Sequence, residues 1–405
     1  MKARGKAEVR KIAALGAAAR RQRTIYRLSR ELALHITDAL ADGRSLRKAA
    51  DWLNERGVKS PGGGRWRPVA ASDQMQALMR TQQFLTHRAA QLFFLVLLAG
   101  LLAPWPASAA EPPRFDVPQA KTSAPLTFVV YGDTRFTAHA EVANVVARRA
   151  LVAKIASENP AAILIGGDLV YAGSDAADYQ VYKEETGVWA AAKIPVFAAL
   201  GNHEFRGCDG DPGPCLENWW TAAAPPGLRP QRWYSLTIGT SILALMLDSD
   251  SALKPGSEQR TWFEQQVRVA AKNIDFILIV LHYPPVRDPL FPRGKDEQEI
   301  ARYLSKNAQL LHAQIVVVGS HVHNYERYYR EGVNYLVSGG GGAKPVPAPR
   351  MFGERSKLKT SVNFHYLRFR LENGRLTGTM ERFDADDRSG NPWTEPDHFE
   401  VTARN

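Results

Sequence analysis

Residues 163–171 read ILIGGDLVY, an apolar run that ends on Gly-Gly-Asp and reaches a tyrosine three positions later. A short apolar run of this kind, bounded by glycines, indicates a buried strand. A carboxylate directly after a strand usually caps a helix or forms a turn. Asp168 therefore becomes informative only if other strand ends carry side chains of related chemistry.

Four further apolar runs end in the same manner. They are LTFVVYGD, IPVFAALGNHE, FILIVLHY and AQIVVVGSHVH, which end at Asp133, at Asn202 with His203, at His282, and at His321 with His323. Side chains that follow the carboxyl ends of strands in α/β sheets gather at one edge of the sheet. Carboxylate, amide and imidazole groups are all metal ligands. The five strand ends together therefore predict one metal site.

The segments between these runs predict an α/β sandwich. Amphipathic stretches indicate helices over about 140–158, 176–192, 257–272 and 296–306, and the segment 205–231 is expected to be a loop. The stretches RWYSLTIG and SILALMLDSD indicate two neighbouring strands. The C-terminal part is expected to be rich in antiparallel hairpins, with a turn at Asn373-Gly374.

The motifs GDTR, GDLVY, GNHE, VLHY and SHVHNYER resemble the five sequence blocks of the calcineurin-like metallophosphoesterases. The resemblance covers roughly residues 126–340. It implies a four-layer αββα sandwich with a centre of two metal ions. It also implies hydrolysis of small-molecule phosphate esters through attack by metal-bound hydroxide. A non-catalytic metal-binding protein on the same scaffold is the alternative.

The resemblance assigns a role to each strand end. Asp168 would bridge both metal ions, Asp133 and His323 would complete one metal position, and the other position would be completed by Asn202, His282 and His321. His203 is expected at the substrate, where it would stabilise phosphoryl oxygens or protonate the leaving group. The neighbouring Glu204 could hold the His203 imidazole through a hydrogen bond.

Two positions depart from the family pattern. The first block usually reads Asp-x-His, with the histidine as a metal ligand, and here Arg135 takes that place. Arg135 could bind a substrate phosphate through its fork of donors, which makes it a candidate catalytic residue, or it could pair with a nearby carboxylate. Ser320 replaces the glycine that usually precedes the last His-x-His block.

Tyr171 could supply the ligand that Arg135 does not. The GDxxY spacing and the HVHxYER ending resemble purple acid phosphatases, in which this tyrosine binds ferric iron. The first block YGDTR differs from the GDxG of those enzymes, and their fibronectin-like domain is missing. The alternative for Tyr171 is a half-buried aromatic side chain at the start of a loop. The metal identity stays open among Fe, Zn and Mn.

The positive charge of the chain is concentrated at its N-terminus. The net charge is +11, and residues 1–110 hold 19 Lys and Arg against 7 Asp and Glu, or +12. Residues 1–78 are expected to form a small basic helical segment that precedes the sandwich. Leu53, Asn54, Gly57 and Trp66 resemble the DNA-contacting C-terminal part of serine recombinases. This segment either binds DNA or is a remnant of a fusion or an incorrect start site, and we favour the remnant.

Residues 79–110 resemble a signal peptide. An apolar core of 12 residues, Leu92–Ala103, follows Arg80 and Arg88 and precedes the small-x-small pattern Ala107-Ser108-Ala109. This core is short for a membrane span, although an uncleaved anchor and a buried helix are alternatives. Translation is expected to start near Met79, which leaves residues 111–405 as a secreted or periplasmic metallophosphoesterase domain.

This location sets the expected partners. A membrane would be a partner only if the signal segment stays uncleaved, and nucleic acid is not expected as one. Cys208 and Cys215 are expected to form a disulfide, because they would lie in an oxidising compartment. The oligomeric state stays open.

Overall fold

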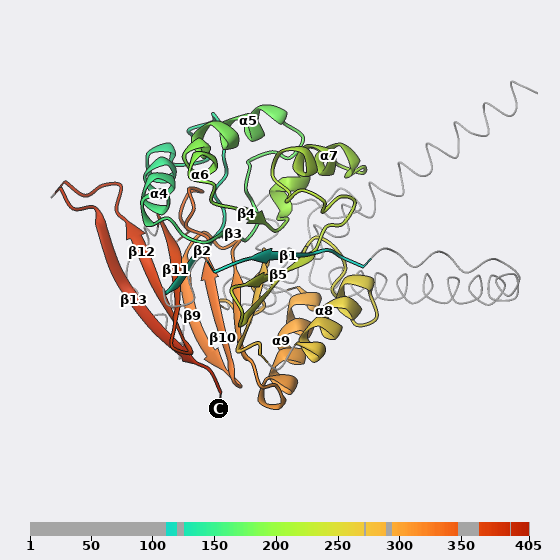
Figure 1. Ribbon diagram of the computed structural model, residues 1–405. Coiled ribbons are helices and arrows are strands. Elements are labelled where there is room, and N and C mark those ends of the chain that lie inside the picture. The colour runs from blue at the N-terminus through green and yellow to red at the C-terminus, as the bar shows by residue number, and fades with distance from the viewer. Residues whose placement is uncertain are drawn as a thin grey trace, which may run out of the picture. The chain divides into compact units, whose positions relative to one another are not determined.

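The chain is described by a computed structural model at residues 111–119, 125–270, 273–288, 294–346, 364–388 and 390–404. These residues form two β-sheets with helices packed against them (Figure 1). The predicted α/β sandwich is therefore confirmed. The predictions for the basic segment 1–78 and the signal segment 79–110 lie outside the described residues.

The six-stranded sheet has the order β13-β12-β11-β2-β3-β4. Strands β2, β3 and β4 are parallel to one another, and β11, β12 and β13 continue the sheet in antiparallel fashion. The hairpin of β11 and β12 turns at Asn373-Gly374, as predicted. The strands are β2 (Leu126–Tyr131), β3 (Ile163–Ile165), β4 (Val196–Ala198), β11 (Phe364–Glu372), β12 (Arg375–Phe383) and β13 (Trp393–Thr402).

The seven-stranded sheet has the order β1-β5-β6-β7-β8-β10-β9. Its central strands β6, β7, β8 and β10 are parallel, whereas β5 and β9 pair with their neighbours β6 and β10 in antiparallel fashion. The strands are β1 (Arg114–Val117), β5 (Tyr234–Ile238), β6 (Ile242–Met246), β7 (Phe276–Leu281), β8 (Gln314–Gly319), β9 (Tyr325–Arg330) and β10 (Val333–Ser338).

Three of the predicted helical segments correspond to single described α-helices with small shifts of their ends. The helix expected from about residue 140 begins after Asn144, whose side chain accepts a hydrogen bond from the Ala147 N–H and caps the helix. Within the described ranges, no helix is long and apolar enough to cross a bilayer. The helices are α4 (Val145–Glu158), α5 (Ala176–Glu185), α6 (Gly187–Ala191), α7 (Gly213–Ala222), α8 (Glu258–Val269) and α9 (Lys295–Asn307), with short 3₁₀ turns η2 (Asn202–Phe205) and η3 (Ala308–Leu310).

Two helix predictions were wrong. The helix expected over 176–192 is two helices, which meet at Thr186 directly before Gly187. The loop expected over 205–231 contains α7, which buries Leu216 and Trp219. This helix was not predicted because glycine, proline and aspartate precede it. The expected disulfide between Cys208 and Cys215 is present in the same segment.

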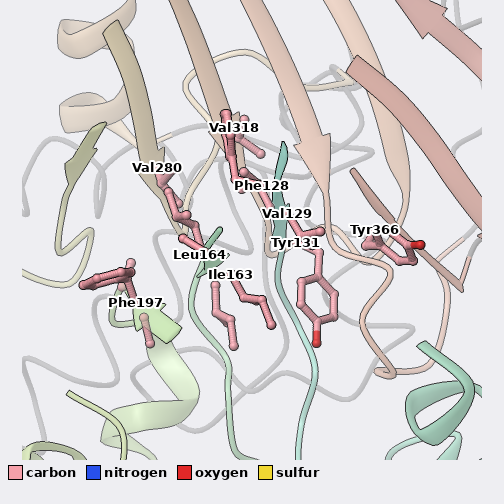
Figure 2. Close-up of a cluster of buried hydrophobic side chains, with 14 of the residues drawn as sticks. Phe128, Val129, Tyr131, Ile163, Leu164, Phe197, Val280, Val318 and Tyr366 are labelled. Carbon is pink, nitrogen blue, oxygen red and sulfur yellow. The ribbon is translucent and has the colours of Figure 1, made fainter. Parts of the chain in front are cut away.

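The core lies between the two sheets and extends under the helices. Strand β7 is buried on both faces: Phe276, Leu278 and Val280 join one hydrophobic cluster, and the residues between them join a second cluster with α8 and α9. This explains why its sequence FILIVL is a continuous apolar run. Val280 of this strand appears in Figure 2 with Phe128 and Leu164 of the other sheet.

Phe128 provides a test of this core. It is fully buried and stacks on Phe369, with ring centroids 5.1 Å apart. Replacement by alanine removes the ring and leaves a cavity, so Phe128→Ala should lower the free energy of unfolding by about 3–5 kcal/mol. Urea unfolding measures this loss. The control Tyr329→Ala, at a strand position that is 69% exposed, should change stability by less than about 0.5 kcal/mol. Equal effects of the two substitutions would contradict the assigned core.

Candidate metal centre

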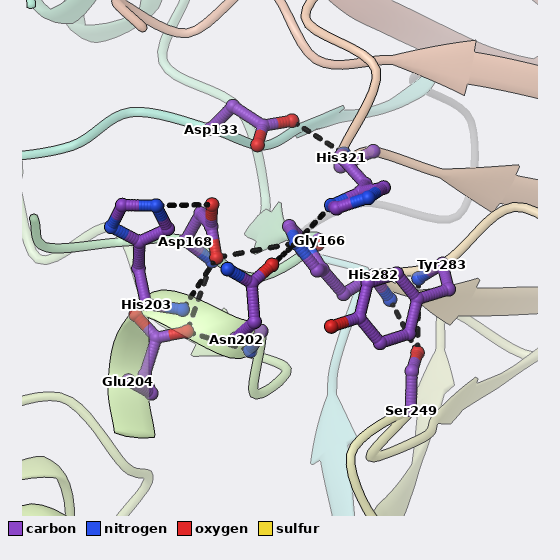
Figure 3. Close-up of polar contacts among 12 residues, drawn as sticks. Asp133, Gly166, Asp168, Asn202, His203, Glu204, Ser249, His282, Tyr283 and His321 are labelled. Carbon is purple, nitrogen blue, oxygen red and sulfur yellow. Dashed lines mark hydrogen bonds and ion pairs between the residues drawn. The ribbon is translucent and has the colours of Figure 1, made fainter. Parts of the chain in front are cut away.

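The predicted site residues lie at strand ends of both sheets. Asp133, Asp168 and Asn202 follow β2, β3 and β4 of the six-stranded sheet, and His282 and His321 follow β7 and β8 of the seven-stranded sheet. Figure 3 shows these side chains directed toward one another. The two sheets therefore each contribute one side of the site.

Four of the predicted ligands form a tight group, which we call the four-ligand cluster: Asp168, Asn202, His282 and His321. The His282 Nε2 atom lies at its centre. It is 3.0 Å from Asn202 Oδ1, 3.2 Å from Asp168 Oδ1 and 3.2 Å from His321 Nδ1. These are the four residues that the resemblance assigns to one metal position.

The tautomer of His282 shows why this cluster suits a cation. His282 Nδ1 lies 3.0 Å from the Gly166 carbonyl oxygen. A carbonyl oxygen only accepts hydrogen bonds, so Nδ1 carries a proton and Nε2 is the ring atom that faces the oxygens of Asn202 and Asp168. Imidazole nitrogen and amide and carboxylate oxygens are all metal ligands, so the residues present fit a metal ion.

The charge states support the same conclusion. Burial alone would raise the pKa of Asp168, but the neighbouring His282, His203 and Arg135 outweigh burial and lower it to about 2. Burial, reinforced by the adjacent His282, lowers the pKa of His321 to about 2. The cluster therefore offers an ionised carboxylate and a neutral imidazole, which are the forms that bind metal ions.

Two of the other predicted ligands, Asp133 and His323, lie next to each other. Together with Asp168, we call them the first metal position. Asp133 Oδ2 accepts a hydrogen bond from the His321 N–H at 2.7 Å, and Asp133 Oδ1 lies 3.4 Å from His323 Nε2. Ligand atoms of Asp133, Asp168 and His282 all lie within 4.8 Å of one another. Asp133 therefore lies close to the four-ligand cluster.

The backbone at the site is unusual. Nine described residues other than glycine have a positive φ, and five of them are predicted site residues: Asp133, Arg135, Asp168, His321 and His323. Left-handed backbone is unfavourable for residues with a side chain and persists where the surrounding structure imposes it. This concentration marks the strand ends as a functional site, and it includes Arg135.

Arg135 and Tyr171 lie in different surroundings. Arg135 Nη2 lies 3.4 Å from Asp168 Oδ2 and 3.1 Å from His323 Nε2, so the expected pairing with a carboxylate is present. The Tyr171 ring lies under the Arg206 guanidinium, 4.1 Å from its carbon, and its centroid is 5.4 Å from that of His203. Within the described part of the chain, the Tyr171 hydroxyl makes no hydrogen bond to the predicted metal ligands. Tyr171 as a ligand stays a prediction.

His203 lies next to Asp168 and outside the four-ligand cluster. Its backbone N–H donates to Asp168 Oδ1 at 3.0 Å, and its Nε2 lies 3.7 Å from Asp168 Oδ2. Its Nδ1 lies 2.6 Å from the Tyr171 carbonyl oxygen, so Nδ1 carries a proton and Nε2 is left to exchange one. Burial lowers the pKa of His203, although the Asp168 charge opposes this effect.

Glu204 has a different role from the one expected. Its carboxylate does not hold the His203 imidazole but accepts hydrogen bonds from four backbone N–H groups, those of Gly201 and of Asp168, Leu169 and Val170. Burial and the Asp168 charge raise the pKa of Glu204, and these N–H groups oppose the rise. The buried carboxylate thereby fixes the loop after β3 to the loop after β4. A glutamate in GNHE gives no sequence signal for this role.

Several supporting residues were not identified from the sequence. The Ser249 hydroxyl accepts the backbone N–H groups of His282 and Tyr283, and the Tyr283 ring packs edge-on against His321 at 4.6 Å. Ser320 is accommodated because Gly132 and Gly166 face its hydroxyl. A side chain at either glycine position would collide with that hydroxyl. The DSD triplet that contains Ser249 follows a strand, which is the only signal that could have indicated its role.

The glycine run 339–342 passes close to the site. A Cβ atom at Gly339 would lie 2.5 Å from Asp133 Oδ2. The Gly341 N–H donates to the Gly132 carbonyl, one residue before Asp133. Of the two interpretations of this run, close backbone approach and plain turn chemistry, the structure supports close approach.

The role of Glu204 can be tested without any metal. Glu204→Gln places an amide N–H₂ group against backbone N–H groups and leaves at least one of them unsatisfied. We expect a loss of about 1–3 kcal/mol in the free energy of unfolding, measured by urea unfolding in the presence of a chelator. The control Glu184→Gln removes the charge of an exposed glutamate on α5. A Glu204→Gln variant as stable as this control would contradict the assigned role.

Comparison with known proteins gives two family-model matches. Residues 126–325 match the family model described as calcineurin-like phosphoesterase, and residues 30–78 match a recombinase model. No curated protein gives a significant match. A purple acid phosphatase, PPD1 from seeds of yellow lupin (Lupinus luteus), has a similar structure, with a TM-score of 0.53 and 17% identity over 70% of this chain and 54% of that chain. This chain thus spans about half the length of that phosphatase.

Two further structures are less similar. GAP50, described as the anchor in the inner membrane complex of Plasmodium, gives a TM-score of 0.48 at 17% identity over 69% of this chain and 90% of that chain. A dimetal phosphatase from Danio rerio gives 0.47 at 13% identity over 69% and 99%. The matched family model and the two-sheet fold agree with the resemblance seen in the five motifs. Residues 126–325 of this chain match the calcineurin-like phosphoesterase family model.

Proposed function

We propose that this protein is a metal-dependent phosphoric ester hydrolase whose centre takes two metal ions. The observation that supports this most directly is the four-ligand cluster, in which His282 Nε2 lies 3.0 and 3.2 Å from the oxygens of Asn202 and Asp168. The family-model match supports hydrolysis of a small-molecule phosphate ester. The fold alone supports neither a monoester nor a diester over the other.

The residues have distinct proposed roles. Asn202, His282 and His321 would hold one ion and Asp133 and His323 the other, with Asp168 shared and Tyr171 as the further predicted ligand of the first metal position. When bound, such ions supply Lewis acidity toward a water molecule and the phosphate oxygens. His203 Nε2 is the atom placed to pass a proton to the leaving group, because Nδ1 is held by the Tyr171 carbonyl.

The proposed location is the periplasm or the exterior of the cell. The apolar core of 79–110 and its small-x-small end support cleavage of a signal peptide. The disulfide between Cys208 and Cys215 supports an oxidising compartment. The recombinase match at residues 30–78 supports DNA binding as a second candidate function, but a DNA-binding segment ahead of an export signal would not meet DNA.

Catalysis is tested by turnover of an aryl phosphate after loading with Mn, Zn or Fe. Asn202→Ala should lower metal content, because it removes a ligand of the four-ligand cluster. His203→Ala should retain metal but lower kcat by about 100-fold or more, because a proton donor is lost. His312→Ala is the matched control, since this partly exposed histidine precedes β8 at the end opposite His321. Unchanged turnover in both site variants would contradict the proposed function.

Export is tested by the mature N-terminus. Full-length protein produced in a host with a Sec pathway should be recovered outside the cytoplasm, and its intact mass should correspond to a start near Ala110 or Glu111. Leu95→Arg, which places a charge in the apolar core of the signal segment, should abolish processing. Recovery of an uncleaved cytoplasmic protein that binds DNA through residues 1–78 would favour the second candidate.

A further inference from the structure

The two predicted metal positions differ in their neighbouring groups, because Arg135 contacts ligand atoms of the first metal position. We propose that the Arg135 guanidinium occupies the first metal position, so that the centre binds one metal ion tightly and a second ion only by displacing Arg135. This inference rests on the proposed function, because it concerns the same centre. It assigns to Arg135 control over how many ions the protein holds.

Arg135 contacts the atoms that an ion would need. Its Nη2 lies 3.1 Å from His323 Nε2 and 3.4 Å from Asp168 Oδ2. These are the imidazole nitrogen and the carboxylate oxygen that the first metal position offers. The Arg135 side chain is only 15% exposed, and that of Asp168 is fully buried. A metal ion that coordinates both atoms would have to take the place of Nη2.

Hydrogen-bond chemistry distinguishes the two positions. His323 Nδ1 lies 2.9 Å from the Lys344 carbonyl oxygen, so the neutral ring presents a lone pair on Nε2. A guanidinium only donates, so the contact with Arg135 selects the neutral ring. Here a protein cation already contacts the acceptor atoms, whereas in the four-ligand cluster three ligand atoms lie within 3.2 Å of His282 Nε2.

The backbone holds Arg135 in this place. Its φ is 46°, its N–H donates to the Asp168 carbonyl at 3.0 Å, and its own carbonyl accepts from Arg148 Nη1 at 2.8 Å. Arg148 is almost fully buried and makes two contacts of 2.8 Å with the Glu185 carboxylate. The position of Arg135 is therefore fixed by a buried ion pair and by the same loop that carries Asp168.

Tyr171 does not compete with Arg135 for this position in the structure. Its ring packs against Arg206 and His203, and the parts of the chain that the structure describes show no hydrogen bond from its hydroxyl to Asp133, Asp168 or His323. Arg135 carries a permanent positive charge, which repels a divalent cation. The first metal position should therefore bind an ion more weakly than the four-ligand cluster.

Metal stoichiometry tests this inference without any activity measurement. Protein stripped with a chelator is titrated with Mn²⁺ by calorimetry, and bound metal is counted by mass spectrometry after gel filtration. The natural protein should bind one ion tightly and a second about 10–100-fold more weakly. Arg135→His removes the competing charge, adds an imidazole and should bind two ions tightly. Arg135→Lys keeps a positive charge and should still bind one.

The controls separate folding from binding. Arg149→His changes an exposed arginine of α4 and should leave the stoichiometry at one tight ion. Arg135→Ala removes the charge without adding a ligand and should strengthen binding of the second ion, which keeps the test valid if the histidine variant fails to fold. Circular dichroism verifies that each variant is folded.

Three outcomes would overturn the inference. The first is two ions bound with equal affinity by the natural protein. The second is a folded Arg135→His variant, together with Arg135→Ala, that binds no more metal than the natural protein. The third is a visible charge-transfer band of the iron-loaded protein that disappears in Tyr171→Phe, which would give the first metal position to a tyrosinate. Absence of metal binding in every variant would overturn the proposed function as well.

Discussion

The buried carboxylate of Asp168 is the constraint on which the site depends. A negative charge with no contact to water is unfavourable unless positive or polar partners surround it. Here the partners come from both sheets: His282 lies 3.2 Å from one oxygen, and Arg135 lies 3.4 Å from the other. The loops after β2, β3 and β7 must therefore meet at one point, and the two sheets pack with their strand ends in register around this group.

Glu204 makes that arrangement rigid. It is a second buried carboxylate, and its four backbone contacts replace the water that both loops would otherwise bind. One result is that Asp168 keeps a left-handed backbone conformation, which a free loop would relax. The loop after β3 thus presents the Asp168 carboxylate in a fixed direction.

The sequence predicted which residues meet, but not how their neighbours hold them. Strand ends such as Asp168 and His282 were identified because buried strands have a clear apolar pattern and the ligand types are few. The helix α7 was missed because Pro212 and Gly213 stand at its start and its apolar face is short. The role of Glu204 was missed because a sequence does not indicate which backbone N–H groups a side chain will contact. These contacts depend on how two loops approach each other.

Arg135 shows where a family pattern and a particular chain separate. From the sequence, an arginine in place of a histidine leaves the first metal position one ligand short, and two interpretations of the arginine were equally compatible with that gap. In the structure the guanidinium contacts both His323 and Asp168, whereas the Tyr171 ring lies against Arg206. A permanent cation meets the same acceptors as a metal ion without depending on metal supply. The acceptor atoms of His323 and Asp168 therefore obtain a positive charge from the protein itself.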